Sequence, residues 1–460
     1  MPTPVQYADA NRDRFLQSLL KLARIPSVST DPAYAEDVGR AAAFLAEELN
    51  HAGLHRVEVA PTAGHPVVYG EWLEAGDGAP TVLFYAHYDV QPALKEDGWD
   101  TEPFEPTAKD GKIYARGIGD DKLHSVMVVK MAEALIRSDE GSPINLKLAI
   151  EGEEEMGSRN FAPWVEANRE RLKADYCLIC DGGLENRDLP TVNYALRGLL
   201  ACEFTVRGPK SDLHSGTHGG RVHNPAQVVA EMVARLHEES GHVAVPGFYD
   251  DVDDLSDTER SELNQHVMTP EDFERRVGAP QSWGEHEYSL IETATSRPTL
   301  EINGIFDGYS GDGMKTVIPA RATAKITCRL VYNQVPERIF EQIKLFLHQI
   351  KPPTVHLDVE LYGRADPVVV PTDSPIVKML VRAYRHHWST PPLFKRMGGT
   401  VPIASIFHRE LGLPLLVIGF NVEDAGFHGP NEFIFEELFH KGLDTMLHLA
   451  REIGNVEVRD

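Results

Sequence analysis

The sequence lacks long apolar segments and any concentration of positive charge. No apolar run approaches the roughly 18 residues that a membrane-spanning helix needs, so we expect no membrane insertion. The 460-residue chain carries 45 Lys and Arg against 70 Asp and Glu, a formal net charge of −25. No basic stretch interrupts this acidic background to bind phosphate groups or anionic lipid. We therefore expect neither nucleic acid nor a membrane as a partner.

Cysteine is also scarce, with four residues in the whole chain, too few for a disulfide framework of this length. Cys177 and Cys180 have the spacing of a redox pair, but they lie in an apolar, strand-like run, which indicates two buried thiols. The first residues lack the apolar core of a signal peptide. Together these features predict a cytoplasmic protein.

Several common functional motifs are missing as well. The sequence contains no H-E-x-x-H, no G-x-S-x-G, no Walker loop and no dinucleotide-binding fingerprint. These absences argue against the hydrolase and cofactor classes that such motifs define.

The length predicts two or three domains, and the pattern along the chain suggests how they are arranged. Strands alternate with helices in residues 1–196 and again in residues 365–460, which predicts an α/β domain with a mostly parallel sheet covered by helices. Residues 197–364 instead favour an inserted α+β domain with an antiparallel sheet. Within it, residues 240–297 form a long polar stretch that we expect to be irregular. We expect helices at 7–24, 33–52, 123–137, 158–172, 225–238, 336–350, 373–388, 402–411 and 433–453, and strands at 57–60, 66–71, 81–86, 144–150, 175–180, 199–206, 316–330, 355–361 and 414–419.

A possible metal ligand follows one of the predicted buried strands. The apolar run of residues 81–86 ends at His87, and Asp89 lies two residues further on. A neutral imidazole can bind a metal through one ring nitrogen while a carboxylate accepts the N–H of the other. Alone, this triplet is more typical of a turn with a solvated histidine.

Four further groups of acids and histidine follow predicted strands or turns. They are Asp120 with Asp121, Glu153 to Glu155, Asp181, and His428. The carboxyl ends of parallel strands share one edge, where ligands bind, so these groups should converge with His87. Such a set can hold two bridged divalent ions, with zinc favoured by the nitrogen and oxygen ligands and manganese or cobalt also suitable. One glutamate of the acidic run could serve as a general base. Separately, the acidic run could be a solvated loop and His428 a loop histidine.

Seven blocks in chain order carry a specific resemblance. They read Y-A-H-Y-D-V-Q-P, G-W-D-T-E-P-F-E-P, A-R-G-I-G-D-D-K, E-G-E-E-E-M-G-S, D-L-H-S-G-T-H-G-G, K-T-V-I-P and H-G-P-N-E. They resemble the M20 family of metallopeptidases, and most of all its branch of cytosolic non-specific dipeptidase and carnosinase. The resemblance implies a two-zinc α/β catalytic domain, with the inserted domain acting as a lid and as the contact of a homodimer.

The resemblance also implies roles for individual residues. Asp89 would orient His87, Glu154 would be the general base, and Glu153 would have no catalytic role. One metal would be held by His87, Asp120 and Asp181, and the other by Asp120, Glu155 and His428, with Asp120 bridging.

Substrate contacts are implied in the inserted domain and near the end of the chain. His214, of D-L-H-S-G, would stabilise the developing oxyanion in the active site of the other subunit. Arg329 would bind the substrate carboxylate, for which its planar fork is suited, although it could also be a solvent-facing strand arginine. Further contacts are implied for Thr316, Gly399 and Thr400.

The chain departs from the family pattern at two places. Leu123 and His124 follow D-D-K where the family usually has glycine, and Ala86 replaces the commoner glycine before His87. We expect a small change at the start of the helix at 123–137 and no loss of metal.

The implied activity is hydrolysis of the peptide bond of dipeptides or short peptides with a free C-terminal carboxylate. A hydroxide held between the metals would attack the carbonyl, with Glu154 as base. One alternative is an N-acyl or N-carbamoyl amino acid amidohydrolase, which would differ only in its pocket. A remote alternative is an inactive binding or scaffold protein, which should have lost the base or a ligand.

Overall fold

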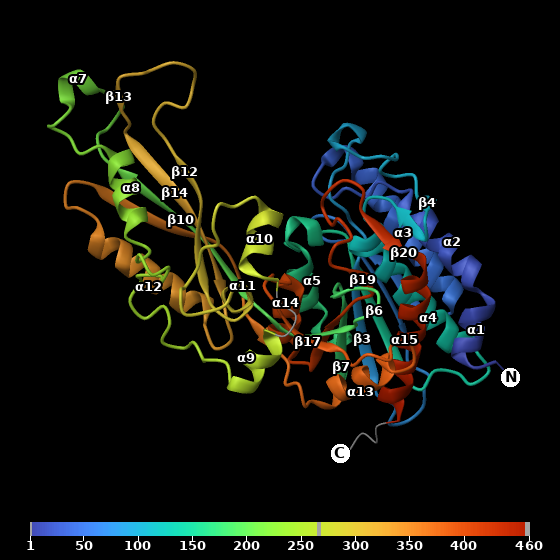
Figure 1. The fold of residues 1–460 in the computed structure, drawn as a ribbon. Coiled ribbons are helices and arrows are strands. Elements are labelled where there is room, and N and C mark those ends of the chain that lie inside the picture. The colour runs from blue at the N-terminus through green and yellow to red at the C-terminus, as the bar shows by residue number, and fades with distance from the viewer. Residues whose placement is uncertain (1, 265–267, 456–460) are drawn as a thin grey trace. The chain divides into compact units, whose positions relative to one another are not determined.

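The computed structural model describes residues 2–264 and 268–455, and these form two compact units (Figure 1). Unit 1 comprises the described residues of Met1–Tyr194, Val370–Lys395 and Ile406–Asp460. Unit 2 comprises Ala195–Val369 and Arg396–Ser405. Residues 396–405, which the sequence analysis grouped with the final segment, therefore belong to unit 2 by their contacts.

Unit 1 is built around a sheet whose central strands are parallel. The strand order is β1-β2-β6-β3-β7-β18-β9. β3 pairs in parallel with β6 and β7, and β18 pairs in parallel with β7, while the outer strands are antiparallel to their neighbours. The predicted mostly parallel α/β sheet is confirmed. The strands are β1 (His55–Ala60), β2 (Val67–Trp72), β3 (Thr81–His87), β6 (Asn145–Glu151), β7 (Tyr176–Cys180), β9 (Thr191–Leu196) and β18 (Leu415–Ile418), and β9 also pairs with β16 (Val368–Val369) and β17 (Leu393–Met397).

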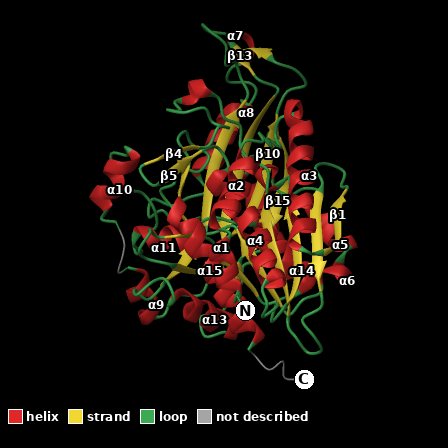
Figure 2. Ribbon diagram, turned by 90° about the vertical axis from the view of Figure 1, so that its right-hand side faces the viewer, coloured by secondary structure: helices red, strands yellow, loops and turns green. Residues whose placement is uncertain are grey.

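Helices cover both faces of the central strands, which are apolar and buried nearly throughout. α4 is buried along most of its length because α3 and α15 pack against it. Figure 1 shows α4 and α15 on one side of β3, with α5 on the other, and Figure 2 shows the strands flanked by helices. The helices of this unit are α1 (Pro4–Ala10), α2 (Arg12–Ala23), α3 (Ala35–Ala52), α4 (Leu123–Arg137), α5 (Phe161–Ala167), α6 (Arg169–Leu172), α13 (Pro375–Tyr384) and α15 (Glu436–Gly454), and α14 (Pro402–Leu411) begins in unit 2 and ends here.

Two helices predicted as continuous are interrupted. Residues 7–24 divide between α1 and α2 at Asn11, and residues 158–172 divide between α5 and α6 at Asn168. Both asparagines have non-helical backbone angles, with φ −114° at Asn11 and φ −109° at Asn168. Asparagine competes with helical hydrogen bonding through its own side chain, which explains the breaks. The helices predicted at 123–137, 336–350 and 402–411 have the bounds that were expected.

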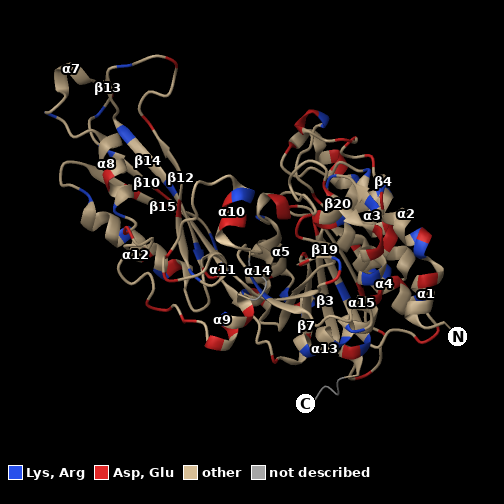
Figure 3. Cartoon of the chain, in the orientation of Figure 1, with Lys and Arg blue, Asp and Glu red and all other residues tan. Residues whose placement is uncertain are grey.

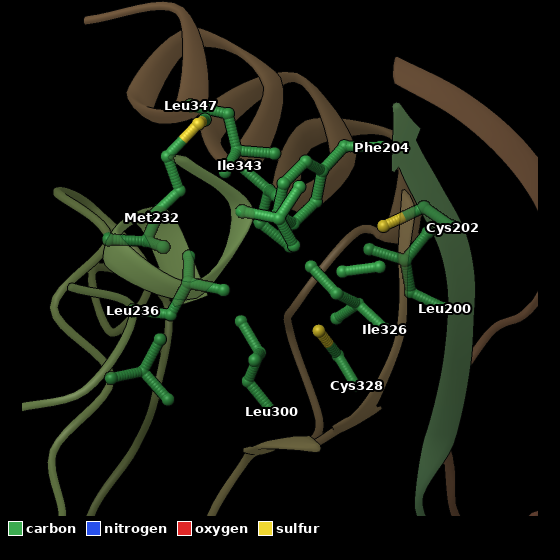
Figure 4. Close-up of a cluster of buried hydrophobic side chains, with 14 of the residues drawn as sticks. Leu200, Cys202, Phe204, Met232, Leu236, Leu300, Ile326, Cys328, Ile343 and Leu347 are labelled. Atoms are coloured by element: carbon green, nitrogen blue, oxygen red, sulfur yellow. The ribbon is translucent and has the colours of Figure 1, made fainter. Parts of the chain in front are cut away.

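Unit 2 contains a four-stranded antiparallel sheet in the order β12-β14-β10-β15. Side chains alternate along β10 between a buried and a half-exposed face, and α8 and α12 cover the buried face. Figure 4 shows this core, in which Phe204 of β10 and Ile326 of β14 meet Met232 of α8 and Ile343 of α12. The predicted α+β texture is confirmed. The elements are β10 (Gly198–Arg207), β12 (Thr299–Phe306), β14 (Arg321–Leu330), β15 (His356–Ala365), α8 (Pro225–Ala234) and α12 (Pro336–Ile350), with β11 (Leu213–His214), β13 (Val317–Ile318) and α7 (Ser215–His218) beyond the sheet.

The stretch 240–297 is less irregular than predicted, although its residues 265–267 lie outside the described part of the chain. It contains α9 (Asp257–Leu263), α10 (Pro270–Val277) and α11 (Leu290–Thr295). α9 begins with a capping box between Ser256 and Glu259, and α11 with one between Ser289 and Glu292. These Ser-x-x-Glu signals stand in the sequence, but helices this short depend on tertiary packing, which the sequence does not display.

Charged residues of both signs are interspersed over the elements of each unit, as the blue and red segments of Figure 3 show. None of the described helices is both long and apolar enough to cross a membrane.

Candidate metal centre

Three predicted metal-binding regions lie at the carboxyl ends of neighbouring parallel strands in unit 1. His87 is the last residue of β3, and it pairs with Glu151, the last residue of β6. A helical turn at Glu154–Met156 follows β6, and Asp181 follows the last residue of β7. Because the carboxyl ends of parallel strands share one edge, these groups meet without being close in sequence.

Asp120 and His428 reach the same place by another route. Asp120 lies in an irregular turn, Ile118–Lys122, which precedes α4. His428 lies in a loop, with a left-handed φ of 58°. The expectation that every ligand directly follows a strand of the main sheet, and that Asp120 opens a helix, was therefore wrong for these two. The two segments are joined by small sheets instead: β4 (Thr107–Lys109), β5 (Lys112–Tyr114) and β20 (Phe433–Phe435) form one, and β8 (Gly183–Leu184) and β19 (Asn421–Val422) form the other.

The five predicted ligands form two groups that share Asp120. His87 Nε2 lies 3.1 Å from Asp120 Oδ1 and 4.0 Å from Asp181 Oδ1. His428 Nε2 lies 3.0 Å from Asp120 Oδ2 and 3.2 Å from Glu155 Oε2. Within each group the ligand atoms all lie within 4.8 Å of one another. Nitrogen and oxygen donors at this spacing suit two divalent cations, one at each carboxylate oxygen of Asp120.

Asp89 holds the His87 ring and also the acidic turn beside it. Its Oδ1 lies 3.3 Å from His87 Nδ1, which leaves Nε2 facing Asp120. The same carboxylate accepts the backbone N–H groups of Glu154 and Glu155, each at 3.1 Å, and the Ser29 hydroxyl at 2.6 Å. Asp89 is fully buried. The predicted orienting contact is present, and the additional bonds link it to the position of the acidic turn.

The three glutamates of the acidic run have different surroundings. Glu153 is buried, and its carboxylate accepts the backbone N–H of His65 at 2.8 Å and of Asn160 at 3.1 Å. Glu155 accepts a hydrogen bond from Gln91 Nε2 at 2.7 Å in addition to facing His428. Burial raises the pKa of Glu154 to about 7. A carboxyl with a pKa near neutrality, next to a ligand group, can both accept and return a proton.

Glu432 is an organising residue to which the sequence analysis gave no role. It is the last residue of H-G-P-N-E and is fully buried. Its carboxylate accepts the backbone N–H groups of Gly117 at 2.8 Å, Gly119 at 2.9 Å and Asp120 at 3.1 Å, and it pairs with Arg116 Nη1 at 2.7 Å. Glu432 thereby fixes the turn that presents Asp120. The motif marked it, but only the fold reveals its partners.

Glu432→Ala is expected to lower the free energy of unfolding by about 3–5 kcal/mol, because it leaves the Arg116 guanidinium buried without its partner. Chemical denaturation of the metal-free protein measures this change without the contribution of bound ions. Glu436→Ala, at an exposed position four residues further on, is the matched control. Equal stabilities for the two variants would contradict the role of Glu432.

A second buried chain of hydrogen bonds begins at one of the departures from the family pattern. The backbone N–H of Phe420 donates to His124 Nε2 at 2.9 Å, so the proton of this imidazole lies on Nδ1. His124 Nδ1 donates to Asp121, whose other oxygen accepts the backbone N–H of His87 at 3.0 Å. His124 therefore connects the loop after β18 to the end of β3, which is more than the small local change that was expected.

The predicted substrate contacts lie in unit 2 and form two separate groups. Arg329 Nη1 donates to the hydroxyl of Thr400 at 2.7 Å, and Gly399 is the preceding residue. His214 is exposed and pairs with Val317 between β11 and β13, directly beside Thr316. Its ring Nδ1 accepts the backbone N–H of Gly216 at 3.0 Å. The first group lies at the Leu330 end of β14 and the second lies beyond its Arg321 end.

Comparison with known proteins agrees with this architecture. The model of peptidase family M20/M25/M40 matches residues 83–452, most of the chain. The chain belongs to this family. The match confirms the resemblance stated above, and the M20 fold accounts for a sheet domain interrupted by a smaller one.

Relatives cover almost the whole chain. It is 30% identical to the Cys-Gly metallodipeptidase of Schizosaccharomyces pombe, over 97% of each chain. It is also 30% identical to the human Beta-Ala-His dipeptidase, over 93% of this chain and 88% of the relative. Among solved structures, the M20 family metallo-carboxypeptidase Sso-CP2 from Sulfolobus solfataricus superposes with a TM-score of 0.85 at 30% identity, covering 96% of this chain and 99% of the other. The chain is thus a full-length M20-type match to metallopeptidases.

Proposed function

We propose that this M20 enzyme hydrolyses dipeptides or short peptides that carry a free C-terminal carboxylate. The observation that carries the proposal is the pair of ligand groups sharing Asp120, with the buried Glu154 in the same turn as Glu155. The dipeptidase relatives, which match over nearly the full length, support dipeptides as the substrate class.

The chain's own residues would divide the chemistry between them. The two ligand groups would hold a pair of divalent cations, which polarise a carbonyl and lower the pKa of water. Zinc suits the mixed nitrogen and oxygen donors best, and manganese or cobalt would also fit. Glu154 would take a proton from the attacking water and deliver it to the leaving amine. Asp89 would keep the Nε2 of His87 turned toward the ligand site.

Arg329 would bind the substrate carboxylate. Its only printed polar partner is the Thr400 hydroxyl, and among the described residues it forms no ion pair. A half-buried guanidinium without a carboxylate partner suits a carboxylate from outside the chain, which it can bind through two parallel N–H donors.

A homodimer explains why the substrate-contact residues lie in two groups. From Arg321 to Arg329, β14 is about 26 Å long at ~3.3 Å per residue. An extended dipeptide spans only about 7 Å. One copy of unit 2 therefore does not bring both His214 and Arg329 to the same dipeptide. In the proposed dimer, His214 would come from the second subunit, where it would stabilise the developing oxyanion, with unit 2 as the lid and dimer contact.

We also propose a cytoplasmic location. All four cysteines are free and buried, as a protein in a reducing compartment would have them.

A substrate panel tests the proposed activity. Metal-loaded protein is incubated with Cys-Gly, β-Ala-His and alanyl-alanine, and in parallel with N-acetyl and N-carbamoyl amino acids. Release of free amino acids from the dipeptides is the expected result. Hydrolysis confined to the acyl or carbamoyl compounds would establish the amidohydrolase alternative, and no hydrolysis by fully metal-loaded protein would favour the binding or scaffold alternative.

Mixing two inactive variants tests whether subunits share their active sites. His214→Ala and Glu154→Gln should each have low activity, and subunit exchange should restore about a quarter of the wild-type rate, because one site in a mixed dimer then carries neither change. His218→Ala, which changes a neighbouring histidine outside the proposed site, is the control for His214→Ala. No recovery after verified exchange would rule out a contribution in trans.

A further inference from the structure

The stretch 240–297 reaches the proposed carboxylate site through one side chain, Arg197. This residue joins β9 to β10 and is half-buried. Its Nε donates to the carbonyl of Gly398 at 2.7 Å, and its Nη1 lies 3.4 Å from the carbonyl of Thr293 and 3.3 Å from that of Arg297. One guanidinium therefore ties the end of the stretch to the Gly398 loop.

The contact continues from Arg197 to Arg329 through one hydroxyl. Thr400 Oγ1 donates to the backbone carbonyl of Arg197 at 2.7 Å, and it accepts from Arg329 Nη1 at the same distance. A hydroxyl has a single hydrogen, so donation to the carbonyl leaves its lone pairs for Arg329. The direction of the Arg329 fork is thus coupled to the position of the Arg197 backbone.

The loop and the stretch also approach each other closely. A Cβ atom at Gly398 would lie 2.6 Å from the carbonyl oxygen of Ala294 in α11, so this position requires glycine. The acceptor carbonyls are themselves held in place, because Arg297 forms a buried ion pair with Glu285, with Nε and Oε2 at 2.6 Å, and lies over the ring of Tyr288 at 4.2 Å. The stretch therefore presents a rigid set of acceptors to Arg197.

Neither Arg197 nor Arg329 forms an ion pair with an acid among the described residues. Burial and the neighbouring charge of Arg329 lower the pKa of Arg197 to about 10, which leaves it charged at neutral pH. Two guanidiniums without a carboxylate between them create a positive potential that favours an anion at this place. Arg197, however, uses its fork on backbone carbonyls, so direct binding of substrate falls to Arg329.

We propose that Arg197 is a positioning residue through which the stretch 240–297 fixes Arg329 for recognition of the substrate's C-terminal carboxylate. This inference rests on the proposed dipeptidase function and adds a role for the stretch. It predicts that Arg197 matters for peptides that end in a carboxylate and much less for the same peptides ending in an amide.

The test compares alanyl-alanine with its C-terminal amide, using the full-length, metal-loaded enzyme. The wild type should prefer the acid. In Arg197→Met, the KM for the acid should rise by about tenfold or more while kcat changes little, and the preference for acid over amide should fall by a similar factor. Arg197→Lys keeps the charge but lacks the fork, and it should show a weaker form of the same change.

Two further variants separate positioning from general stability. Thr400→Val removes the hydroxyl with little change of shape and should reproduce the loss of preference. Combining it with Arg197→Met should add little, because both act along one chain of contacts. Arg235→Met is the control, since Arg235 is an exposed arginine of the same unit that also donates to a carbonyl.

The outcomes distinguish this inference from the proposed function. A wild-type enzyme that hydrolyses no dipeptide would overturn the proposed function and this inference with it. An active wild type whose acid preference is unchanged in both Arg197→Met and Thr400→Val would overturn this inference alone. Equal losses on acid and amide would show that Arg197 only maintains the fold.

Discussion

Glu154→Gln is expected to retain the metals and to lower kcat by about 10²–10⁴-fold, the contribution of a general base. Glutamine has nearly the shape of glutamate but cannot take up the proton of the attacking water. Glu154 itself belongs to neither predicted ligand group. The measurement is kcat on a dipeptide, together with the metal content of the same preparation.

The neighbouring glutamate provides the control for this prediction. Glu153→Gln changes the same charge one residue away, where the carboxylate binds backbone N–H groups of His65 and Asn160. It should affect thermal stability more than kcat. Loss of metal in Glu154→Gln would make Glu154 a ligand, and a kcat close to that of the wild type would place the base elsewhere.

The parts of the site that could be predicted are those that depend on strand ends. His87, Asp181 and the acidic run follow strands that are apolar throughout, and a parallel sheet brings such ends to one edge whatever their separation in sequence. Assigning Glu154 and Glu155 separately needed the family resemblance as well, because three adjacent glutamates look alike in a sequence.

Other parts could not be predicted because their partners are set only by the tertiary fold. Glu432 binds backbone N–H groups that lie more than 300 residues away along the chain. Arg197 binds carbonyls of a stretch that shows no strong periodicity. Backbone donors and acceptors carry no residue identity, so a contact to them leaves no pattern in the sequence. This is why the stretch 240–297 had no predicted role.

The same reasoning explains why the route to Asp120 was predicted incorrectly. The turn at Ile118–Lys122 is positioned by Glu432 and by the small sheet of β4, β5 and β20, and each of those strands is only three residues long. Strands this short give no readable alternation. The identity of the ligand could be predicted from the motif, whereas the structure that supports it could not.

Removal of divalent metal is expected to abolish hydrolysis and to lower the melting temperature. Asp120, Glu155 and Asp181 converge on one place with only two histidines between them, so the folded protein without cations gathers negative charge there. Cations that bind only the folded state stabilise it by about 2.7 kcal/mol when present at 100 times their Kd. Chelation followed by dialysis, with activity and melting temperature recorded on each sample, measures both effects.

Re-addition of single metals then identifies which cation the site uses. Zinc, manganese and cobalt are added separately to the chelated protein, and the metal that restores both activity and melting temperature at the lowest concentration is assigned to the site. Asp120→Ala is the decisive control, because it removes the residue shared by both ligand groups and should make the melting temperature insensitive to chelator and metal. A chelated wild type that is verified to be metal-free and still hydrolyses dipeptides would contradict the metal-dependent mechanism. A metal-dependent melting temperature that persists in Asp120→Ala would place the cations outside these two groups.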